Sequence, residues 1–314
     1  MFFFEKIPLQ TIVIALIVLT LLIAANEITR RSKWISIAIY IILPIVLTVC
    51  VWPKSAGSGT TSGYWFAWVK TYSALAGVIG FMALRFIKGL DQNKFMRMFP
   101  AIILSVNILE AVYRDFECFS KSGVIENGLY LLGGPWNIIN GLAGLINIIT
   151  ITGWTCIRVS KTRTKDMVWA DQLWFWIIAY DLWNISYCYN CISDRSFYAG
   201  FLIIAACTIA EFTIKKGIWL QHRAQTLALY AMFTLTFPSF ADTSIYAVKS
   251  SHNPTAMLVL SLAALLANLA VLFYEIAQLK KYRCNPFKQE VYTHLNSYNK
   301  NLIENGLETS KTHY

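Results

Sequence analysis

The sequence predicts an all-α protein: a polytopic transmembrane bundle of about nine helices, with the amino end outside and the carboxyl end in the cytoplasm. Three observations predict this fold, namely the composition, the apolar segments and the placement of Lys and Arg. Of 314 residues, 56% are hydrophobic and 14% are charged, against roughly 45–50% and about 25% in soluble domains. The bilayer is therefore the expected solvent.

Nine segments are apolar and long enough to cross a hydrocarbon core, which requires about 20 helical residues. Their approximate spans are 7–26, 34–52, 64–87, 98–114, 136–158, 168–190, 198–214, 218–237 and 255–278. The residues before the first span lack a basic region, and Glu27, Arg30 and Arg31 follow it directly. We therefore interpret the first span as a retained helix and not as a cleaved signal peptide.

Lys and Arg alternate between the connections, as the enrichment of positive charge in short cytoplasmic loops requires. Basic residues follow the first, third, fifth, seventh and ninth spans: Arg30, Arg31, Lys33; Arg85, Lys88, Lys94, Arg97; Arg158, Lys161, Arg163, Lys165; Lys215, Lys216, Arg223; Lys280, Lys281, Arg283, Lys288. The other connections hold few. This alternation predicts an odd number of spans and a cell inner (plasma) membrane protein with a cytoplasmic carboxyl end.

The chain divides into a transmembrane helical domain, 1–284, and a polar cytoplasmic tail of uncertain order, 285–314. Two outer connections, Pro53–Gly63 and Lys121–Pro135, are rich in turn-forming residues and are expected to be flexible loops. The net charge of +10 suggests nucleic acid only where a folded basic domain carries it. None is expected here, so the predicted partner is the lipid bilayer and not nucleic acid.

Polar stripes on three predicted helices are the main functional signal. An ionisable group at mid-helix costs about 2.5–3.5 kcal/mol in a membrane and therefore usually faces protein or water. Residues three, four or seven apart share one face of a helix. By this spacing the stripes are Asn107, Glu110, Arg114; Asn137, Asn140, Asn147; and Asp171, Trp174, Asp181, Asn184, Cys188, Cys191.

These stripes predict a polar cavity open to the outside, provided that the third to sixth spans are neighbours. Lys70 reaches a similar depth on the third span. The candidate ligand-binding residues are Asp181, Asn184, Glu110, Asn107, Asn137, Asn140, Lys70 and Trp174. The alternative is that these groups only hydrogen-bond helices to one another. We favour the cavity, because Asp and Glu are harder than Asn to explain as helix-packing contacts.

The segment Trp219–Gln225 (WLQHRAQ) lies at the cytoplasmic mouth of the eighth span. It is interpreted as a contact for an anion or a lipid headgroup, or as a plain interfacial cap. Glu211 and Glu275 are expected to approach the same interface beside lysines.

The sequence gives little support for an enzyme. It contains no HExxH or GxSxG motif, and we predict neither a cofactor nor a bound metal. Four cysteines are expected near the outer face, where a disulfide is chemically permitted, and free thiols, a disulfide or a redox or metal role all stay open for them: Cys50, Cys118, Cys188 and Cys191. His252 is a candidate catalytic residue, with Ser251 beside it and Asp242 as a possible acid.

Several stretches together resemble an uncharacterised family of bacterial multi-pass membrane proteins. They are NEITRRSKW (26–34), GPWNIINGLAG (134–144), AYDLWNISYCYNC (179–191), LQHRAQTLA (220–228) and KSSHNPT (249–255). The resemblance covers nearly the whole chain. It implies a bacterial inner-membrane protein and carries no activity or substrate.

The leading hypothesis is a transporter or permease for a small polar or cationic solute. Asp181, Asn184 and Glu110 are expected to line an outward-facing site, with an acid carrying a proton. The alternatives are a membrane-embedded enzyme that acts on lipid or a small molecule, through His252 or the outer thiols, and a membrane sensor or scaffold that acts through the tail. The sequence specifies neither the solute nor an oligomeric state.

Overall fold

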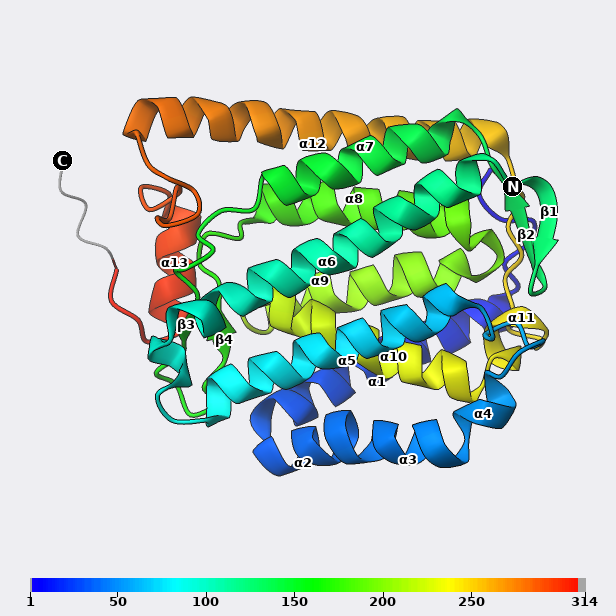
Figure 1. Cartoon of the computed structure of the whole chain (residues 1–314), viewed down its shortest axis with the longest axis horizontal. Helices are drawn as coiled ribbons and strands as arrows, with labels where there is room; N and C mark the ends of the chain where they lie inside the picture. The colour runs from blue at the N-terminus through cyan, green and yellow to red at the C-terminus, as the bar shows by residue number, and fades with distance from the viewer. Residues whose placement is uncertain (1, 310–314) are drawn as a thin grey trace.

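The computed structural model describes residues 2–309, which form a bundle of helices (Figure 1). Within this range, each of the nine predicted spans contains a helical segment. The segments are α1 (Leu9–Arg31); α2 (Lys33–Ile37), η1 (Ala38–Ile42) and α3 (Leu43–Cys50) in one continuous run; α5 (Trp65–Phe86); α6 (Lys94–Phe119); α7 (Pro135–Ile149); α8 (Trp174–Cys191); η4 (Phe197–Leu202) with α9 (Ile203–Thr213); α10 (Trp219–Thr236); and α12 (Pro254–Tyr282).

Short elements fill the connections. They are α4 (Trp52–Ser55), η2 (Leu90–Gln92), β1 (Ser122–Glu126), β2 (Leu129–Leu132), β3 (Arg158–Val159), β4 (Met167–Val168), η3 (Ser193–Arg195), α11 (Ser239–Asp242) and α13 (Asn296–Glu304). The two strand pairs, β1–β2 and β3–β4, are antiparallel and separate from each other.

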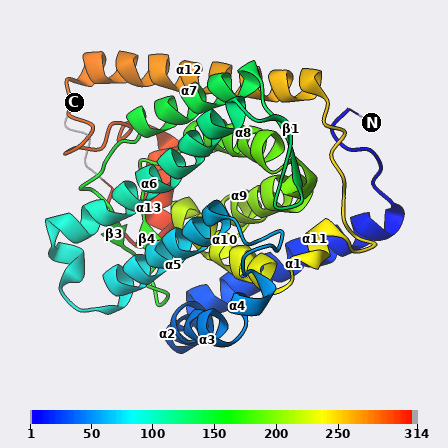
Figure 2. The same cartoon turned by 45° about the vertical axis from the view of Figure 1, so that its right-hand side comes forward.

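Five helical segments of the described chain are long and apolar enough to cross a membrane: α1, the run from Lys33 to Cys50, α5, α6 and α12. Large apolar side chains lie exposed on the outside of the bundle, among them Leu9, Val49, Leu266 and Phe273. In a membrane this apolar surface faces acyl chains. The shorter helices α8 and α10 are buried along most of their length, and α12 and the α1–α3 region lie on opposite sides of them (Figure 2).

Successive long segments run in alternating directions, which gives the bundle two distinct ends (Figure 1). We call the end that holds α13, β3 and β4 the α13 end. All five basic connections lie there. Hydrogen bonds join the connections at this end to one another. Arg30 Nη1 donates to Asp166 Oδ2 at 2.7 Å, and the backbone N–H of Trp169 donates to the carbonyl of Gly217 at 2.8 Å.

We call the opposite end, with β1, β2 and α11, the hairpin end. The amino-terminal segment joins it through a hydrogen bond of 3.0 Å from the backbone N–H of Glu5 to the carbonyl of Lys249. The β1–β2 pair corrects the expected flexible loop at 121–135. Its turn is Asn127–Gly128, both at positive φ, which is the preferred pair for a two-residue hairpin.

The connection between α7 and α8 also differs from the prediction. The spans 136–158 and 168–190 were too long, because α7 ends at Ile149 and α8 begins at Trp174. The apolar residues between them belong to a folded connection, in which Ile157 and Met167 are fully buried. Hydropathy alone does not separate a buried loop from a helix end.

The tail, expected to be of uncertain order, is folded within the described range 285–309. Val291, Tyr292, Tyr298 and Leu302 are buried in one apolar cluster with residues of the α7–α8 connection. Tyr298 and Leu302 are four residues apart and so lie on one face of α13.

Candidate functional site

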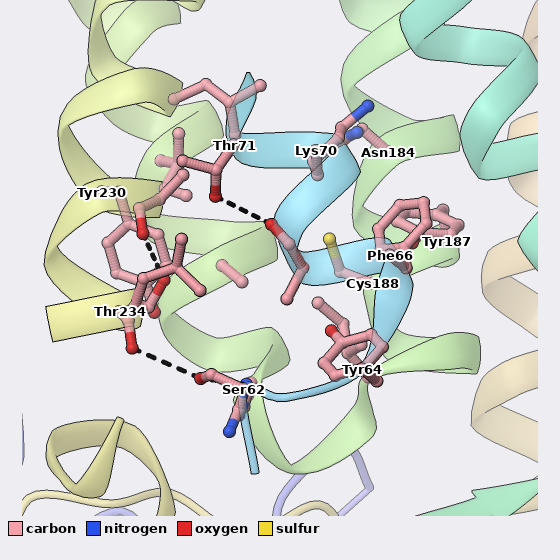
Figure 3. A pocket seen from close by; sticks show the side chains of 18 of the residues that line it. Ser62, Tyr64, Phe66, Lys70, Thr71, Asn184, Tyr187, Cys188, Tyr230 and Thr234 are labelled. Atoms are coloured by element: carbon pink, nitrogen blue, oxygen red, sulfur yellow. Dashed lines mark hydrogen bonds between the residues drawn. The ribbon is translucent and has the colours of Figure 1, made fainter. Parts of the chain in front are cut away.

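A cavity of about 90 Å³ lies between α5, α8, η4 and α10. It has room for several water molecules. From α10, Arg223, Leu227, Tyr230 and Thr234 line it, at intervals of four, three and four residues that place them on one helix face. The cavity therefore extends along about three turns of α10, from the hairpin end toward Arg223. Figure 3 shows Lys70 and Asn184 toward one end and Ser62 toward the other.

Three cationic side chains line this cavity: Lys70, Arg195 and Arg223. Lys70 Nζ lies 3.6 Å from a carboxylate oxygen of Glu110. Arg195 is held by Asp242, with two hydrogen bonds of 2.6 Å from its Nε and Nη2. Two of the three positive charges are thus neutralised by carboxylates.

Arg223 is the exception, because no carboxylate within residues 2–309 forms an ion pair with it. Its side chain is 4% exposed. Nη2 donates to Asn184 Oδ1 at 3.3 Å, Nε donates to Tyr180 Oη at 3.4 Å, and Nη1 has no partner in the described chain. A buried guanidinium without an anion is energetically unfavourable. The cavity therefore holds a guanidinium that no described carboxylate contacts directly.

Two tyrosine hydroxyls of the same cavity also lack hydrogen-bond partners within the described residues. Tyr187 and Tyr230 are 3% and 5% exposed, respectively, and both line the cavity. Buried tyrosines normally hydrogen-bond their hydroxyls. Arg223, Tyr187 and Tyr230 thus offer three unused donors to whatever fills the space.

At the end of the cavity toward the hairpin end, Ser62 accepts a long hydrogen bond of 3.4 Å from Arg195 Nη1. Burial acts to lower the pKa of Arg195, but the hydrogen bond and the charge of Asp242 outweigh it and raise the pKa above its ordinary value. Burial raises the pKa of Tyr64, which lines the same end. Arg195 stays charged and Tyr64 stays neutral at physiological pH.

Four of the predicted site residues lie at or beside this cavity. Lys70 and Asn184 line it, whereas Glu110 and Asn107 stand behind Lys70. Lys70 Nζ donates to the carbonyl of Asn107 at 2.8 Å, and Ser73 Oγ donates to Glu110 at 3.0 Å. These contacts fix the ammonium group at the cavity wall.

Asn137 and Asn140 lie elsewhere, in a polar cluster around Asp115 that we call the Asp115 cluster. The Asp115 carboxylate is fully buried and accepts hydrogen bonds from Asn137 Nδ2 at 3.1 Å, Asn140 Nδ2 at 2.7 Å and Cys191 Sγ at 3.2 Å. These contacts tie α6, α7 and α8 together. The predicted single site that joins Glu110, Asn140 and Asp181 is therefore wrong for Asn140.

The remaining two predicted residues also lie off the cavity. Asp181 faces α9, where Thr208 Oγ1 donates to its Oδ2 at 2.7 Å, and it does not line the cavity. Trp174, at the start of α8, is 55% exposed and stands about 15 Å along the helix from Asn184, at 1.5 Å per residue. The stripe on α8 is thus divided among four environments: the exposed surface at Trp174, the contact of Asp181 with α9, the cavity at Asn184 and the Asp115 cluster at Cys191.

Sequence reasoning missed Arg223 and Asp115 as buried groups. Arg223 was placed at the interface because it lies near the start of its span, but its long side chain reaches Tyr180 and Asn184 inside the bundle. Asp115 lies eight residues from Asn107, on the same helix face. It was overlooked because the predicted span stopped at 114, whereas α6 continues to Phe119.

The residues proposed for enzyme chemistry do not form a catalytic arrangement. His252 Nε2 lies 3.1 Å from Asp194, not from the predicted Asp242, and Ser251 Oγ donates to the carbonyl of Phe2. The serine is thus not hydrogen-bonded to the histidine, as an activated nucleophile requires. All seven cysteines are free thiols in the structure.

No curated protein and no solved structure matches this chain. One family model does match it, over residues 5–304, and it is described as a family of unknown function. The match includes every helix from α1 to α13, and hence both the cavity and the Asp115 cluster. The chain therefore belongs to the family of unknown function DUF5692.

Proposed function

We propose that all nine helical segments cross a bilayer, with the hairpin end outside and the α13 end in the cytoplasm of a plasma (inner) membrane. The five basic connections at the α13 end support this orientation, because cytoplasmic loops are enriched in Lys and Arg. The shorter segments α7, α8, α9 and α10 then contact mainly the other helices and little lipid. Their polar groups are then shielded from lipid.

We further propose that the protein is a carrier for a small anionic solute, which binds in the cavity with its carboxylate or phosphate on Arg223. The unpaired guanidinium is the observation that supports this proposal. A small anion would supply the missing counter-charge and accept hydrogen bonds from Arg223 Nη1, Tyr187 and Tyr230. These charges favour an anion over the cationic solute that the acidic residues of the sequence suggested.

The position of the cavity supports a carrier. Binding sites of transporters lie inside the bundle, commonly beside interrupted helices. Here η4, a π-helical turn, forms part of the wall through Ala199, and π-helical turns occur frequently at functional sites. The volume of about 90 Å³ favours a solute with few heavy atoms.

The test uses purified protein and a panel of acetate, lactate, benzoate and phosphate, with choline as the cationic comparison. We expect at least one anion to bind in isothermal titration and to be taken up by proteoliposomes, and choline to do neither. Arg223→Gln should weaken anion binding about 30-fold or more, the cost of removing one partner of a buried charge pair. Arg223→Lys should retain part of it.

Lys88→Gln is the matched control, because Lys88 is exposed in a connection at the α13 end. It should leave binding unchanged. Binding of choline that survives Arg223→Gln, or anion binding that is equal in Arg223→Gln and the native protein, would contradict the proposal.

A further inference from the structure

Two further hollows lie at the α13 end, away from the Arg223 cavity. One is a groove of about 610 Å³ between α8 and α12, which Leu295 of the tail also lines. The other is a niche of about 370 Å³ between α8, α9 and α13. Both volumes fall in the range of small-molecule sites. Trp174 and Ser297 line both hollows, so the groove and the niche lie next to each other.

The groove is apolar. Its walls include Ile178 from α8 and Ala267, Ala270 and Val271 from α12. It opens on the outer surface of the bundle, where Ile178 and Ala270 are exposed. In a membrane such a surface is covered by acyl chains, and the small side chains of Ala267 and Ala270 leave a furrow that one chain can occupy.

The niche is less apolar than the groove and contains basic side chains. Lys216 and Lys300 line it, together with the acid Glu211. Both carboxylate oxygens of Glu211 already accept backbone N–H groups, from Gly217 at 2.6 Å and Ile218 at 3.1 Å. Lys300 has no ion pair within residues 2–309, and Lys216 Nζ is 4.0 Å from Glu304. The niche thus presents ammonium groups that are weakly paired or unpaired.

Gln172 supplies an independent sign of a ligand. It lines the niche and is 6% exposed, yet neither its Nε2 nor its Oε1 has a hydrogen-bond partner in the described chain. Burying both ends of an amide without partners is unfavourable. The amide offers N–H donors to phosphate oxygens and a carbonyl oxygen that can accept from a hydroxyl group.

Trp174 marks the boundary between groove and niche. Its ring is 55% exposed, and tryptophan prefers the level of lipid headgroups at the membrane interface. An apolar furrow, an interfacial tryptophan and a basic niche thus follow one another along α8. This order matches the acyl chain, glycerol and phosphate of a phospholipid.

We propose that the groove and the niche together bind one anionic glycerophospholipid, with its phosphate among Gln172, Lys216 and Lys300 and an acyl chain between α8 and α12. This inference rests on the membrane orientation proposed above, and it is independent of the solute. Because Ser297, Lys300 and Asn301 belong to the tail segment with α13, the lipid joins that segment to the membrane domain.

The test is native mass spectrometry of the full chain, released from vesicles of equal phosphatidylglycerol and phosphatidylethanolamine. We expect bound phosphatidylglycerol in excess over phosphatidylethanolamine. The double variant Lys216→Gln/Lys300→Gln should reduce the retention of phosphatidylglycerol about tenfold or more, since each lysine near a lipid surface raises the affinity for anionic lipid about fivefold. The matched control is Lys88→Gln/Lys94→Gln, which removes two exposed lysines at the same end.

A second variant, Ala270→Phe, fills the groove and leaves the niche intact. It should also reduce phosphatidylglycerol retention, because the acyl chain loses its place between α8 and α12, whereas a site for a free headgroup alone would be unaffected. Equal retention of both lipids, equal loss in the two double variants, or full retention in Ala270→Phe together with binding of glycerol phosphate would overturn the proposal. A chain that fails to enter membranes would instead refute the orientation on which it rests.

Discussion

The Asp115 cluster and the Arg223 cavity each hold a buried ionisable side chain beside an asparagine, but they differ in how that side chain is satisfied. Asp115 accepts three hydrogen bonds from Asn137, Asn140 and Cys191. Arg223 has one asparagine, one tyrosine, an unused nitrogen and adjacent space. The same residue types therefore pack helices in one place and form a candidate site in the other, and the partners decide which.

The largest expected effect tests the Asp115 cluster as a packing element. Asp115→Ala removes the shared acceptor and leaves the amides of Asn137 and Asn140 buried without partners. Each such group costs about 1–3 kcal/mol, so we expect a loss of about 3 kcal/mol in stability, seen as a large fall in melting temperature in detergent. A variant as stable as the native protein would remove the distinction between the two regions.

Arg223→Gln should act in the opposite direction on the protein without solute. Removing a buried charge that lacks a counterion is neutral or stabilising, by about 1–2 kcal/mol here. The melting temperature in anion-free buffer should therefore rise or stay the same. A clear fall would mean that Arg223 serves packing as Asp115 does.

Two buried tyrosines sharpen the comparison at smaller scale. Tyr198 Oη donates to the carbonyl of Tyr246 at 2.8 Å, so Tyr198→Phe should cost about 1 kcal/mol and leave anion binding unchanged. Tyr230→Phe removes a hydroxyl without a partner and should leave stability nearly unchanged but weaken anion binding. Thermal unfolding and titration calorimetry of both variants check this prediction.

The smallest effect concerns Asp194, at the hairpin end. Burial acts to raise its pKa, but the hydrogen bond and charge of His252 lower it below the ordinary 3.8. The folded state therefore gains stability from ionised Asp194 above about pH 3.8 and loses it as the pH falls through the lower folded pKa. Melting curves recorded from about pH 6 down to about pH 3 should show this loss of stability in the native protein and not in Asp194→Asn.

Hydropathy placed a helix in each predicted span, because the length of an apolar run and the positions of basic residues are local properties of the sequence. The polar residues within those spans identified Lys70 and Asn184, which line the cavity. The sequence pattern did not predict that α9 and α10 complete the cavity in place of α6 and α7. Which helices are neighbours depends on contacts between distant residues, and spacing along one helix carries no such information.

The same limit explains the divided fate of the stripe on α8. Asn184 meets Arg223, Asp181 meets Thr208, and Cys191 meets Asp115. A stripe shows that these side chains avoid lipid, as each of them does, but a helix buried along most of its length has several polar neighbours. The partner of each group follows from the packing of α8 and not from its own periodicity.

The tail has a consequence for how the chain is completed during synthesis. The Asp171 carboxylate accepts the backbone N–H groups of Val291 and Tyr292 at 2.9–3.1 Å, and the carbonyl of Asn305 accepts the N–H of Lys161 at 3.1 Å. A ribosome delivers these tail residues long after α8 has formed. Asp171 therefore has no backbone donors from the tail until more than a hundred further residues have been translated. A nascent chain that stops short of Val291 leaves this carboxylate without those hydrogen bonds.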